Sequence, residues 1–479
     1  MRSMGPRGSH ALTFKNGKFA LTASAVAICA IASPVSASEC RVAPVRALFE
    51  YDAQTQIILD VEAAMARAQA AHGVIPAEAA AEISEKAQVA LIPQSMFDAT
   101  YDVVRHRMVA LLAVWRESLN DAGDQYVHYG ATTVDIYGTA TVLQMDRVLT
   151  ELDTCLAGTI DVMSTLAREH KHTPMIGRTL GQHAQPITFG KKVSAWIGEY
   201  SRHRARLSEL RARVRRSATL KGPVGNYSGL GDKAIEVEQS FASELGLDRA
   251  DLADWSGTRD VIAEYGLMLG LIARSHQRIG QEVFLLQGTD IAEVSEAQRA
   301  GVVGSSSMPH KRNPRDPERL VHAGRTIPRL AEVLGDDVVN LFERDNTSRL
   351  TPVIEEISIT SVDAVRRLNA LLAGLEVDTD RMRANIDRTR GFAMSQRIAF
   401  ALSEYMPRVE AETLTKKVVA NALAADTDFI TALLAEPKVT AHFDLPALSE
   451  LLDPTRIDAP AILQVERVVS DANDPGAER

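Results

Sequence analysis

The middle of the chain carries apolar side chains at steps of three and four residues over long stretches. One such stretch runs from Met145 to Leu166, another runs from Ile262 to Leu286, and a third, rich in Arg and Leu, covers 191–220. Spacing close to a heptad is typical of long helices that pack nearly parallel in a bundle. Alternation of apolar and polar residues is scarce. The sequence therefore predicts an all-α protein whose few strands are short and peripheral.

Shorter helical segments flank this predicted bundle. Residues 52–72 are rich in Ala and predict a helix that ends at Gly73 and Pro76. After Asp378, short helical pieces alternate with prolines, which is typical of a small separate helical domain. The predicted division is a leader at 1–37, an N-terminal helical domain at 38–130, a central bundle domain at 131–377 and a small C-terminal helical domain at 378–479.

The first residues have the order of a secretory signal. Lys15 and Lys18 precede an apolar run at 19–32, and small residues at 33–37 offer a cleavage site after Ala37. The apolar run is too short to span a bilayer as a helix. We expect a periplasmic or secreted protein if this leader is cleaved. The alternative is a disordered or wrongly started leader on a cytoplasmic protein.

Composition removes several classes of function. The formal net charge of −9 argues against nucleic acid or an anionic membrane surface as the main partner, but it leaves room for a local basic site that holds a carboxylate substrate. Three cysteines, Cys29, Cys40 and Cys155, are too few for a disulfide framework, and their spacing suits no zinc site. The sequence has neither the phosphate loop of NTPases nor a dinucleotide-binding glycine fingerprint, so we expect no cofactor.

The most distinctive segment is Gly-Ser-Ser-Ser-Met-Pro-His-Lys-Arg-Asn-Pro at 304–314. Pro309 and Pro314 break a helix, and the glycine and serines favour a loop with free backbone N–H groups. Such a loop can surround an anion with donors, with Lys311 as a fixed positive charge. The segment predicts an anion-binding loop. The alternative is a purely structural role, as a Ser-rich capping loop with a solvated lysine.

This segment resembles the signature of the fumarase/aspartase superfamily, G-S-S-x-M-x-x-K-x-N. Its last six residues, Pro-His-Lys-Arg-Asn-Pro, resemble the adenylosuccinate lyase and carboxymuconate cycloisomerase branch. The resemblance implies an all-α, three-domain subunit with a central bundle of long helices. It also implies a homotetramer in which each active site draws residues from three chains. It assigns the catalytic base to Ser305, whose alkoxide Lys311 and loop N–H groups would stabilise, and it assigns Lys311 and Asn313 to the substrate carboxylate.

A second element, His-Tyr-Gly-Ala-Thr-Thr-Val-Asp at 128–135, resembles the superfamily's H-x-G-x-T-[ST]-x-D motif. Thr132 and Thr133 are expected at the start of a helix, where hydroxyl and N–H groups receive a carboxylate. A simple threonine N-cap is the alternative. The resemblance makes His128 a candidate for substrate binding or proton transfer. His106 matches a family histidine by its spacing to His128, although a lone histidine is more often structural.

A third element at 177–190 departs from the adenylosuccinate lyase pattern. Leu180 stands where those enzymes carry the histidine assigned as general acid, and carboxymuconate cycloisomerases carry a bulky apolar residue there. Thr179 and Gln182 remain candidates for substrate binding. His183 lies three residues further on and is expected to face elsewhere unless the backbone is extended. Trp255 also resembles the cycloisomerase branch.

Two further residues come from the same resemblance. Glu318 matches the glutamate that orients the missing histidine, and we expect it to pair with an arginine instead. Arg344 is a candidate for binding a second anionic group of the substrate.

These features predict a cofactor-independent lyase that acts by β-elimination, or reverse addition, on a substituted succinate or small polycarboxylate, typically releasing fumarate. Lactonisation of 3-carboxy-cis,cis-muconate is the nearest alternative, because a carboxylate leaves without an acid. Adenylosuccinate lyase and a catalytically silent structural member are the others. We expect a small anionic polycarboxylate as substrate, no nucleic acid and no membrane association of the mature form.

Overall fold

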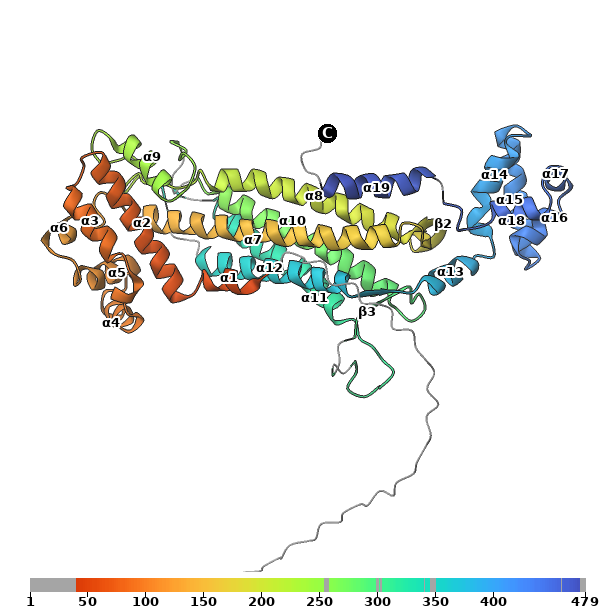
Figure 1. Cartoon of the computed structure of the whole chain (residues 1–479), viewed down its shortest axis with the longest axis horizontal. Helices are drawn as coiled ribbons and strands as arrows, with labels where there is room; N and C mark the ends of the chain where they lie inside the picture. Colours follow the sequence, from red (N-terminus) through yellow and green to blue (C-terminus); the bar gives the residue numbers. More distant parts are fainter. Residues whose placement is uncertain are drawn as a thin grey trace, which may run out of the picture. The chain divides into compact units, whose positions relative to one another are not determined.

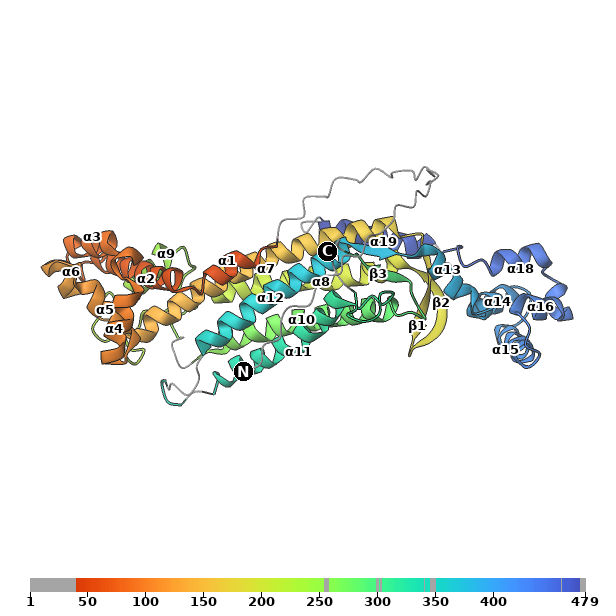
Figure 2. The same cartoon turned by 90° about the horizontal axis from the view of Figure 1, so that it is seen from below.

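Five long helices form the centre of the structure. The computed structural model describes residues 40–253, 258–298, 301, 304–339, 341–344, 350–457 and 459–473. Helix α7 packs against α8, α10 against α11, and α11 against α12, and Figures 1 and 2 show the five running side by side. They are α7 (Thr133–Glu169), α8 (Phe189–Val214), α10 (Asp260–Leu286), α11 (Arg315–Asp336) and α12 (Leu350–Ala373).

The apolar stripes predicted on α7 and α10 form the buried faces of the bundle, and their residues belong to one apolar cluster. The contact between α10 and α11 is close because Gly324 has no side chain. A Cβ atom there would lie 2.3 Å from the Cβ of Gln277 and 2.8 Å from the carbonyl oxygen of Ala273. The predicted all-α bundle is therefore confirmed.

A second apolar core lies around the N-terminal helices. Helix α2 (Tyr51–Ala71) packs against α3 (Ala77–Lys86) and against α9 (Ala234–Glu244), which comes from much later in the chain. Trp115 is buried in this core and donates its indole N–H to the carbonyl of Lys86 at 2.8 Å. The remaining short elements of this region are η1 (Val89–Leu91), α4 (Gln94–Val104), α5 (Arg107–Arg116) and α6 (Asp121–Tyr126).

A third, smaller core lies in the C-terminal region and is centred on buried Phe429 and Leu433. The last helix, α19 (Ala459–Asn473), instead packs back on α8 and α7, and its Val465 and Val469 belong to the core of the bundle. The division at residues 130 and 377 stays a prediction. The other elements here are α13 (Thr379–Asp387), η2 (Phe392–Met394), α14 (Ser395–Leu402), α15 (Arg408–Ala424), α16 (Phe429–Leu434), α17 (Pro437–Thr440) and α18 (Leu445–Leu451).

Strands in the described residues are short, as predicted. Strands β1 (Pro174–Thr179) and β2 (Gln182–Thr188) form an antiparallel hairpin directly after α7. Strand β3 (Val294–Glu296) pairs with β4 (Leu375–Val377). It leads toward residues 304–314, which we call the signature loop. Both strand pairs therefore lie in segments that connect helices, and the bundle itself contains helices only.

A disulfide joins Cys40 to Cys155, across 115 residues of sequence. Cys40 precedes the short helix α1 (Val42–Ala47), which packs against α12 and α7, and Cys155 lies within α7. The sequence analysis expected no disulfide framework and gave no indication of this single bond. Closing so long a loop restricts the unfolded chain, an effect on the order of 4 to 5 kcal/mol in the chain-entropy model.

The bundle also encloses a polar network away from the predicted site residues. The Tyr200 hydroxyl and His276 Nδ1 form a short hydrogen bond, and His203 Nε2 contacts the Ser275 hydroxyl at 2.8 Å. Ser275 donates to Glu199 at 2.7 Å. Both histidines are 1% exposed. A charged imidazolium is costly in such surroundings, so both rings are held neutral.

This burial predicts a loss of stability in acid. Burial lowers the pKa of His203 to about 4 and that of His276 to about 3, from 6.5. The unfolded chain takes up these protons near pH 6.5 and the folded chain does not, so stability is complete above pH 6.5 and falls as the pH drops toward 4. Each unit of pKa difference corresponds to about 1.4 kcal/mol.

The free energy of unfolding, measured by denaturant titration across that pH window, tests this. A His203→Gln/His276→Gln double variant should lose part of the pH dependence, whereas the exposed control His322→Gln should keep it. An equally steep dependence in the double variant would contradict this role of the two buried rings.

Candidate functional site

The start of α7 is held by one buried carboxylate. Asp135 accepts the backbone N–H of Thr132 at 3.0 Å, and the two residues form a reciprocal capping box. Asp135 also accepts the backbone N–H groups of Lys221 and Gly222, at 3.1 and 3.0 Å. Thr132 and Thr133 thus occupy the helix N-terminus predicted for them, where the helix dipole favours an anion.

The turn before this helix has a backbone that requires glycine. Gly130 has φ +72°, and a Cβ there would lie 2.7 Å from Leu230 Cδ2 and 2.9 Å from the carbonyl oxygen of Gly229. His128 itself has φ +60°. The side-chain amide of Gln69 donates to the carbonyl of Tyr129 at 2.7 Å, and this hydrogen bond fixes the turn from the opposite side.

His128 is paired with Glu62, a residue that the sequence gave no reason to single out. The His128 Nδ1 and Glu62 Oε1 atoms are 2.6 Å apart, and the Glu62 side chain is fully buried. Burial by itself lowers the pKa of His128, but the charge and hydrogen bond of Glu62, with Asp135, outweigh it and raise the pKa above its usual value. Glu62 orients the ring, which leaves Nε2 to meet a ligand.

His106 lies two short helices earlier, before α5 and α6, and has a structural role. Its Nδ1 accepts the backbone N–H of Val109 at 3.3 Å and so caps α5. The residue is exposed. Its proposed contact with substrate stays a prediction.

The β1–β2 hairpin presents the third motif. Thr179 and Gln182 are paired across a two-residue turn formed by Leu180 and Gly181, at φ +53° and +76°. Positive φ at both central residues is typical of a type I′ turn. Leu180 is 101% exposed.

The same hairpin is tied to the strand that enters the signature loop. Arg178 forms a two-pronged ion pair with the buried carboxylate of Glu293, at 2.9 and 2.7 Å, and Asn385 donates to Glu293 at 2.8 Å. His183 lies opposite Arg178 in the extended strand β2. Burial, Arg178 and Arg388 lower the pKa of His183, so its ring is neutral at pH 7.

In the signature loop, the backbone at Gly304 lies close to the backbone at Lys311. A Cβ on Gly304 would lie 2.5 Å from the carbonyl oxygen of Lys311, so only glycine permits this approach. The Ser305 hydroxyl accepts the backbone N–H of Met308 at 3.2 Å. The Lys311 N–H donates to the Met308 carbonyl at 3.0 Å. Ser305 is half-buried and Lys311 is exposed.

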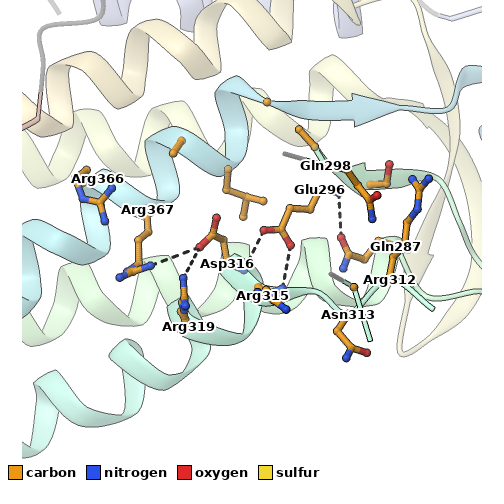
Figure 3. Close-up of a pocket in the computed structure, with 16 residues that line it drawn as sticks. Gln287, Glu296, Gln298, Arg312, Asn313, Arg315, Asp316, Arg319, Arg366 and Arg367 are labelled. Carbon is orange, nitrogen blue, oxygen red and sulfur yellow. Dashed lines mark hydrogen bonds and ion pairs between the residues drawn. The ribbon is translucent and has the colours of Figure 1, made fainter. Parts of the chain in front are cut away.

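The base of this loop is anchored by Glu296 at the end of β3. Its carboxylate accepts the first backbone N–H groups of α11, from Arg315 at 2.9 Å and Asp316 at 3.2 Å. Burial is the main cause that raises the pKa of Glu296, and the Asp316 carboxylate adds to it. Arg312 and Asn313, labelled in Figure 3, line a cavity of about 560 Å³ at this end of the loop.

One chain does not bring all predicted residues together. Thr132 and Thr133 lie at the start of α7, whereas Thr179 and Gln182 follow its end, and a helix of 37 residues is about 55 Å long. Arg344 lies after the 22-residue helix α11, which starts beside Asn313 and is about 33 Å long. The hairpin and the strand before the signature loop do meet, through Arg178 and Glu293.

The expectations for Glu318, Trp255 and the leader are compared with the structure next. Glu318 is exposed, and no arginine pairs with it among the residues that the structure describes, so the expected ion pair is not found. Trp255 and the leader at 1–37 lie outside the described residues.

Within the described ranges, no cluster of three or more His, Cys, Asp or Glu side chains has the arrangement of a metal site. None of the described helices combines the length and apolar character needed to cross a membrane.

The bundle of long helices, the capped threonine pair and the serine loop define a lyase of the fumarase/aspartase type. A family model described as "Lyase" matches residues 41–328, and the chain belongs to this family. It is 34% identical to the 3-carboxy-cis,cis-muconate cycloisomerase of Pseudomonas aeruginosa, over 91% of this chain and 96% of that one. The resemblance expected from the sequence is therefore confirmed.

Two further relatives widen the range of chemistry. The N-acetyl-S-(2-succino)cysteine lyase of Dickeya dadantii is 32% identical, over 87% of this chain and 92% of that one. The crystal structure of a fumarate lyase from Mesorhizobium sp. BNC1 superposes with a TM-score of 0.83 at 29% identity, covering 91% of this chain and all of that one. The chain is accordingly a lyase or cycloisomerase.

The Glu62–His128 pair generates a prediction. Replacing Glu62 with Gln removes the charge that raises the pKa of His128, so burial should dominate and the pKa should fall. An NMR titration of the His128 ring should report this shift, and if His128 takes part in turnover a limb of the pH–rate profile should move to lower pH with it. Glu78→Gln, an exposed change on the next helix, is the control. An unchanged His128 titration in Glu62→Gln would contradict the pairing.

Proposed function

We propose that this chain catalyses a cofactor-independent β-elimination on a substituted succinate or a related small polycarboxylate, or the reverse addition. The observation that carries the proposal is the complete serine loop, in which a backbone N–H of Met308 points at the Ser305 oxygen. A serine hydroxyl is a weak base at neutral pH, and its alkoxide needs such donors and the positive charge that Lys311 brings to the same loop.

In the proposed reaction the Ser305 alkoxide takes the proton from the carbon next to a substrate carboxylate. The electron pair of that C–H bond spreads into the carboxylate, which Lys311 and Asn313 stabilise. It then forms the carbon–carbon double bond while the bond to the leaving group breaks, and the leaving group departs with its electron pair. Thr132 and Thr133 hold a second carboxylate at the N-terminus of α7.

Leu180 restricts the leaving group. A leucine supplies no proton, and an amine must be protonated as it leaves, whereas a carboxylate or a thiolate departs as a stable anion. This favours two substrate classes, the lactone or carboxymuconate of a cycloisomerase and an S-succinylated thiol, over an N-succinylated nucleotide. The relatives from Pseudomonas aeruginosa and Dickeya dadantii carry names that match these two classes.

A substrate panel tests the leaving group. Carboxymuconates, S-succinylated thiols and N-succinylated amines should be compared by ultraviolet absorbance of the unsaturated acid consumed or released. We expect turnover of one of the first two classes at least about a hundredfold faster than of any amine, the size of effect that one general acid supplies. Faster turnover of amines would contradict the reading of Leu180, and no turnover of any class would favour a silent structural protein.

Ser305 carries the sharpest catalytic prediction. Ser305→Ala should lower kcat by about a thousandfold or more, because the proton acceptor is lost. Ser306→Ala removes a neighbouring hydroxyl of the same loop and should leave turnover within a few-fold of the wild type. Circular dichroism checks that both variants are folded. Substantial activity in Ser305→Ala would exclude Ser305 as the base.

The proposed assembly is a homotetramer with shared sites. The support comes from α7, since its length keeps Thr132 away from Thr179 within one chain while substrate binding requires both motifs. Exposed apolar residues on the bundle helices, including Leu267, Leu271, Phe284 and Leu285 of α10, offer the surface for such an assembly.

Export is proposed from the leader together with the disulfide. Cleavage after Ala37 removes Cys29 and leaves Cys40 and Cys155, which are bonded to each other. Disulfides form and persist mainly in oxidising compartments. The proposed locations are therefore the periplasm or the extracellular medium, whereas N-succinylated nucleotides are purine intermediates that stay in the cytoplasm.

Intact-mass spectrometry of the protein from cells that express the whole sequence tests export. We expect a chain that begins at Ser38, and alkylation without reductant should label neither Cys40 nor Cys155. After reduction both should be labelled. A chain that retains Met1 and reacts at both thiols would overturn the proposal.

A further inference from the structure

The β1–β2 hairpin is attached to the rest of the chain by one of its two faces. Ile176 and Arg178 lie two residues apart on β1, so their side chains share a face. Ile176 belongs to a small buried apolar cluster with Ile386 and Met394, and β1 packs against α13, which contains Ile386 (Figure 2). Thr179 follows on the opposite face of the strand and is exposed.

A bulge in the hairpin contributes to this arrangement. The pairing register shifts between Ile176 and Arg178, where Gly177 stands. A Cβ on Gly177 would lie 2.7 Å from the carbonyl oxygen of Gln185, so the close approach of the two strands requires glycine. Because a bulge bends a strand and re-aims its side chains, it helps to determine the direction in which Arg178 points.

The ion pair between Arg178 and Glu293 fixes the attached face. Arg178 donates to both carboxylate oxygens, at 2.9 and 2.7 Å. The Glu293 side chain is fully buried, and Asn385 of α13 donates to the same carboxylate at 2.8 Å. A planar guanidinium that bridges two oxygens is fixed in direction as well as in distance, so the pair constrains the orientation of the hairpin.

Glu293 is itself held by its backbone. Its N–H donates to the carbonyl of Leu286, the last residue of α10, at 2.9 Å. Its carbonyl accepts the N–H of Asp378 at 3.0 Å, and it directly precedes Val294, the first residue of β3. The ion pair therefore joins the hairpin to the end of α10 and to the start of β3.

The outer turn of the hairpin depends on such attachments. Thr179, Leu180 and Gln182 are all exposed. A hairpin of two strands is at best marginally stable by itself in water, so the contacts of its attached face decide where the turn lies.

We propose that Arg178 and Glu293 are positioning residues for substrate binding, because their ion pair places the exposed face of the hairpin, with Thr179 and Gln182, where it can hold a substrate carboxylate. This inference rests on the proposed function, in which the hairpin motif binds substrate. Arg178 acts through its neighbours, since both of its terminal nitrogens donate to Glu293. Loss of the pair weakens the binding of substrate and transition state alike, so it raises KM more than it lowers kcat.

Hydrogen exchange of the full-length protein, measured by mass spectrometry on peptides from 174–188, tests the positioning itself. Arg178→Gln leaves the buried Glu293 without its charged partner, so these peptides should exchange about tenfold faster or more, while peptides of α8 stay unchanged. Arg178→Lys keeps the charge and one hydrogen bond, and its rate should lie between the two. Unchanged exchange of the hairpin in Arg178→Gln would overturn the proposal.

Steady-state kinetics then test the effect on substrate, with whichever of the carboxymuconate and S-succinylated thiol substrates turns over faster. Arg178→Gln should raise KM by about tenfold or more and lower kcat by less than about threefold, and Arg178→Lys should recover part of the loss. A loss confined to kcat would contradict the proposal. Wild-type protein without turnover would count against the proposed function, and hydrogen exchange would still decide the role of the pair.

The matched control is Arg204→Gln, which breaks another two-pronged ion pair of the bundle. Arg204 donates to Asp153 of α7 at 2.7 and 3.0 Å. This variant should leave KM and hairpin exchange unchanged, and an equal rise of KM in Arg204→Gln and Arg178→Gln would overturn the proposal. Circular dichroism checks that the variants are folded, and Arg178→Lys supplies the same comparison if Arg178→Gln does not fold.

Discussion

The length of α7 is the constraint on which the rest of the structure depends. Its 37 residues form one uninterrupted helix, about 55 Å long, with the threonine motif at its start and the hairpin motif beyond its end. A single chain therefore carries parts of a site at places that its own backbone keeps apart. In the proposed assembly other chains complete each site, because α7 keeps the two motifs of one chain apart.

Carboxylates hold each of these parts in place, and three of the four are buried. Asp135 and Glu62 fix the turn at the start of α7, Glu293 ties the hairpin to β3, and Glu296 caps the helix that follows the signature loop. Each accepts backbone N–H groups or pairs with a cationic or imidazole side chain, while Oε2 of Glu62 has no partner among the described residues. Buried charges of this kind are costly when a partner is removed, so they favour one geometry of each loop over its alternatives.

The contiguous motifs could be predicted from sequence because their chemistry is local. The serine loop, the threonine helix start and the long apolar stripes each lie within one segment, and the structure confirms the all-α bundle that they indicated. The residue type at position 180 could also be interpreted from sequence alone. Leu180 cannot donate a proton, whereas the histidine that adenylosuccinate lyases carry at this place can.

The remaining features depend on long-range contacts. Glu62 lies in an Ala-rich helix, and its only signal was an acid within an apolar stretch, while its partner His128 is 66 positions away. The Cys40–Cys155 bond spans 115 residues, and α19 returns to the bundle after the C-terminal core. The cavity lined by Arg312 and Asn313 also collects side chains from α11 and α12. No local pattern encodes such pairings, because they arise only when distant helices pack.

Mixing two inactive variants tests the shared site most directly. Ser305→Ala and His128→Gln chains, co-expressed with different tags and purified through both, should form tetramers in which some sites have both residues intact. If the two residues come from different chains, turnover should recover to roughly a quarter of the wild-type value, the share expected from random assembly. Mixed tetramers that remain as inactive as either parent would contradict the account, because each chain would then have to supply its own Ser305 and His128 to the same site.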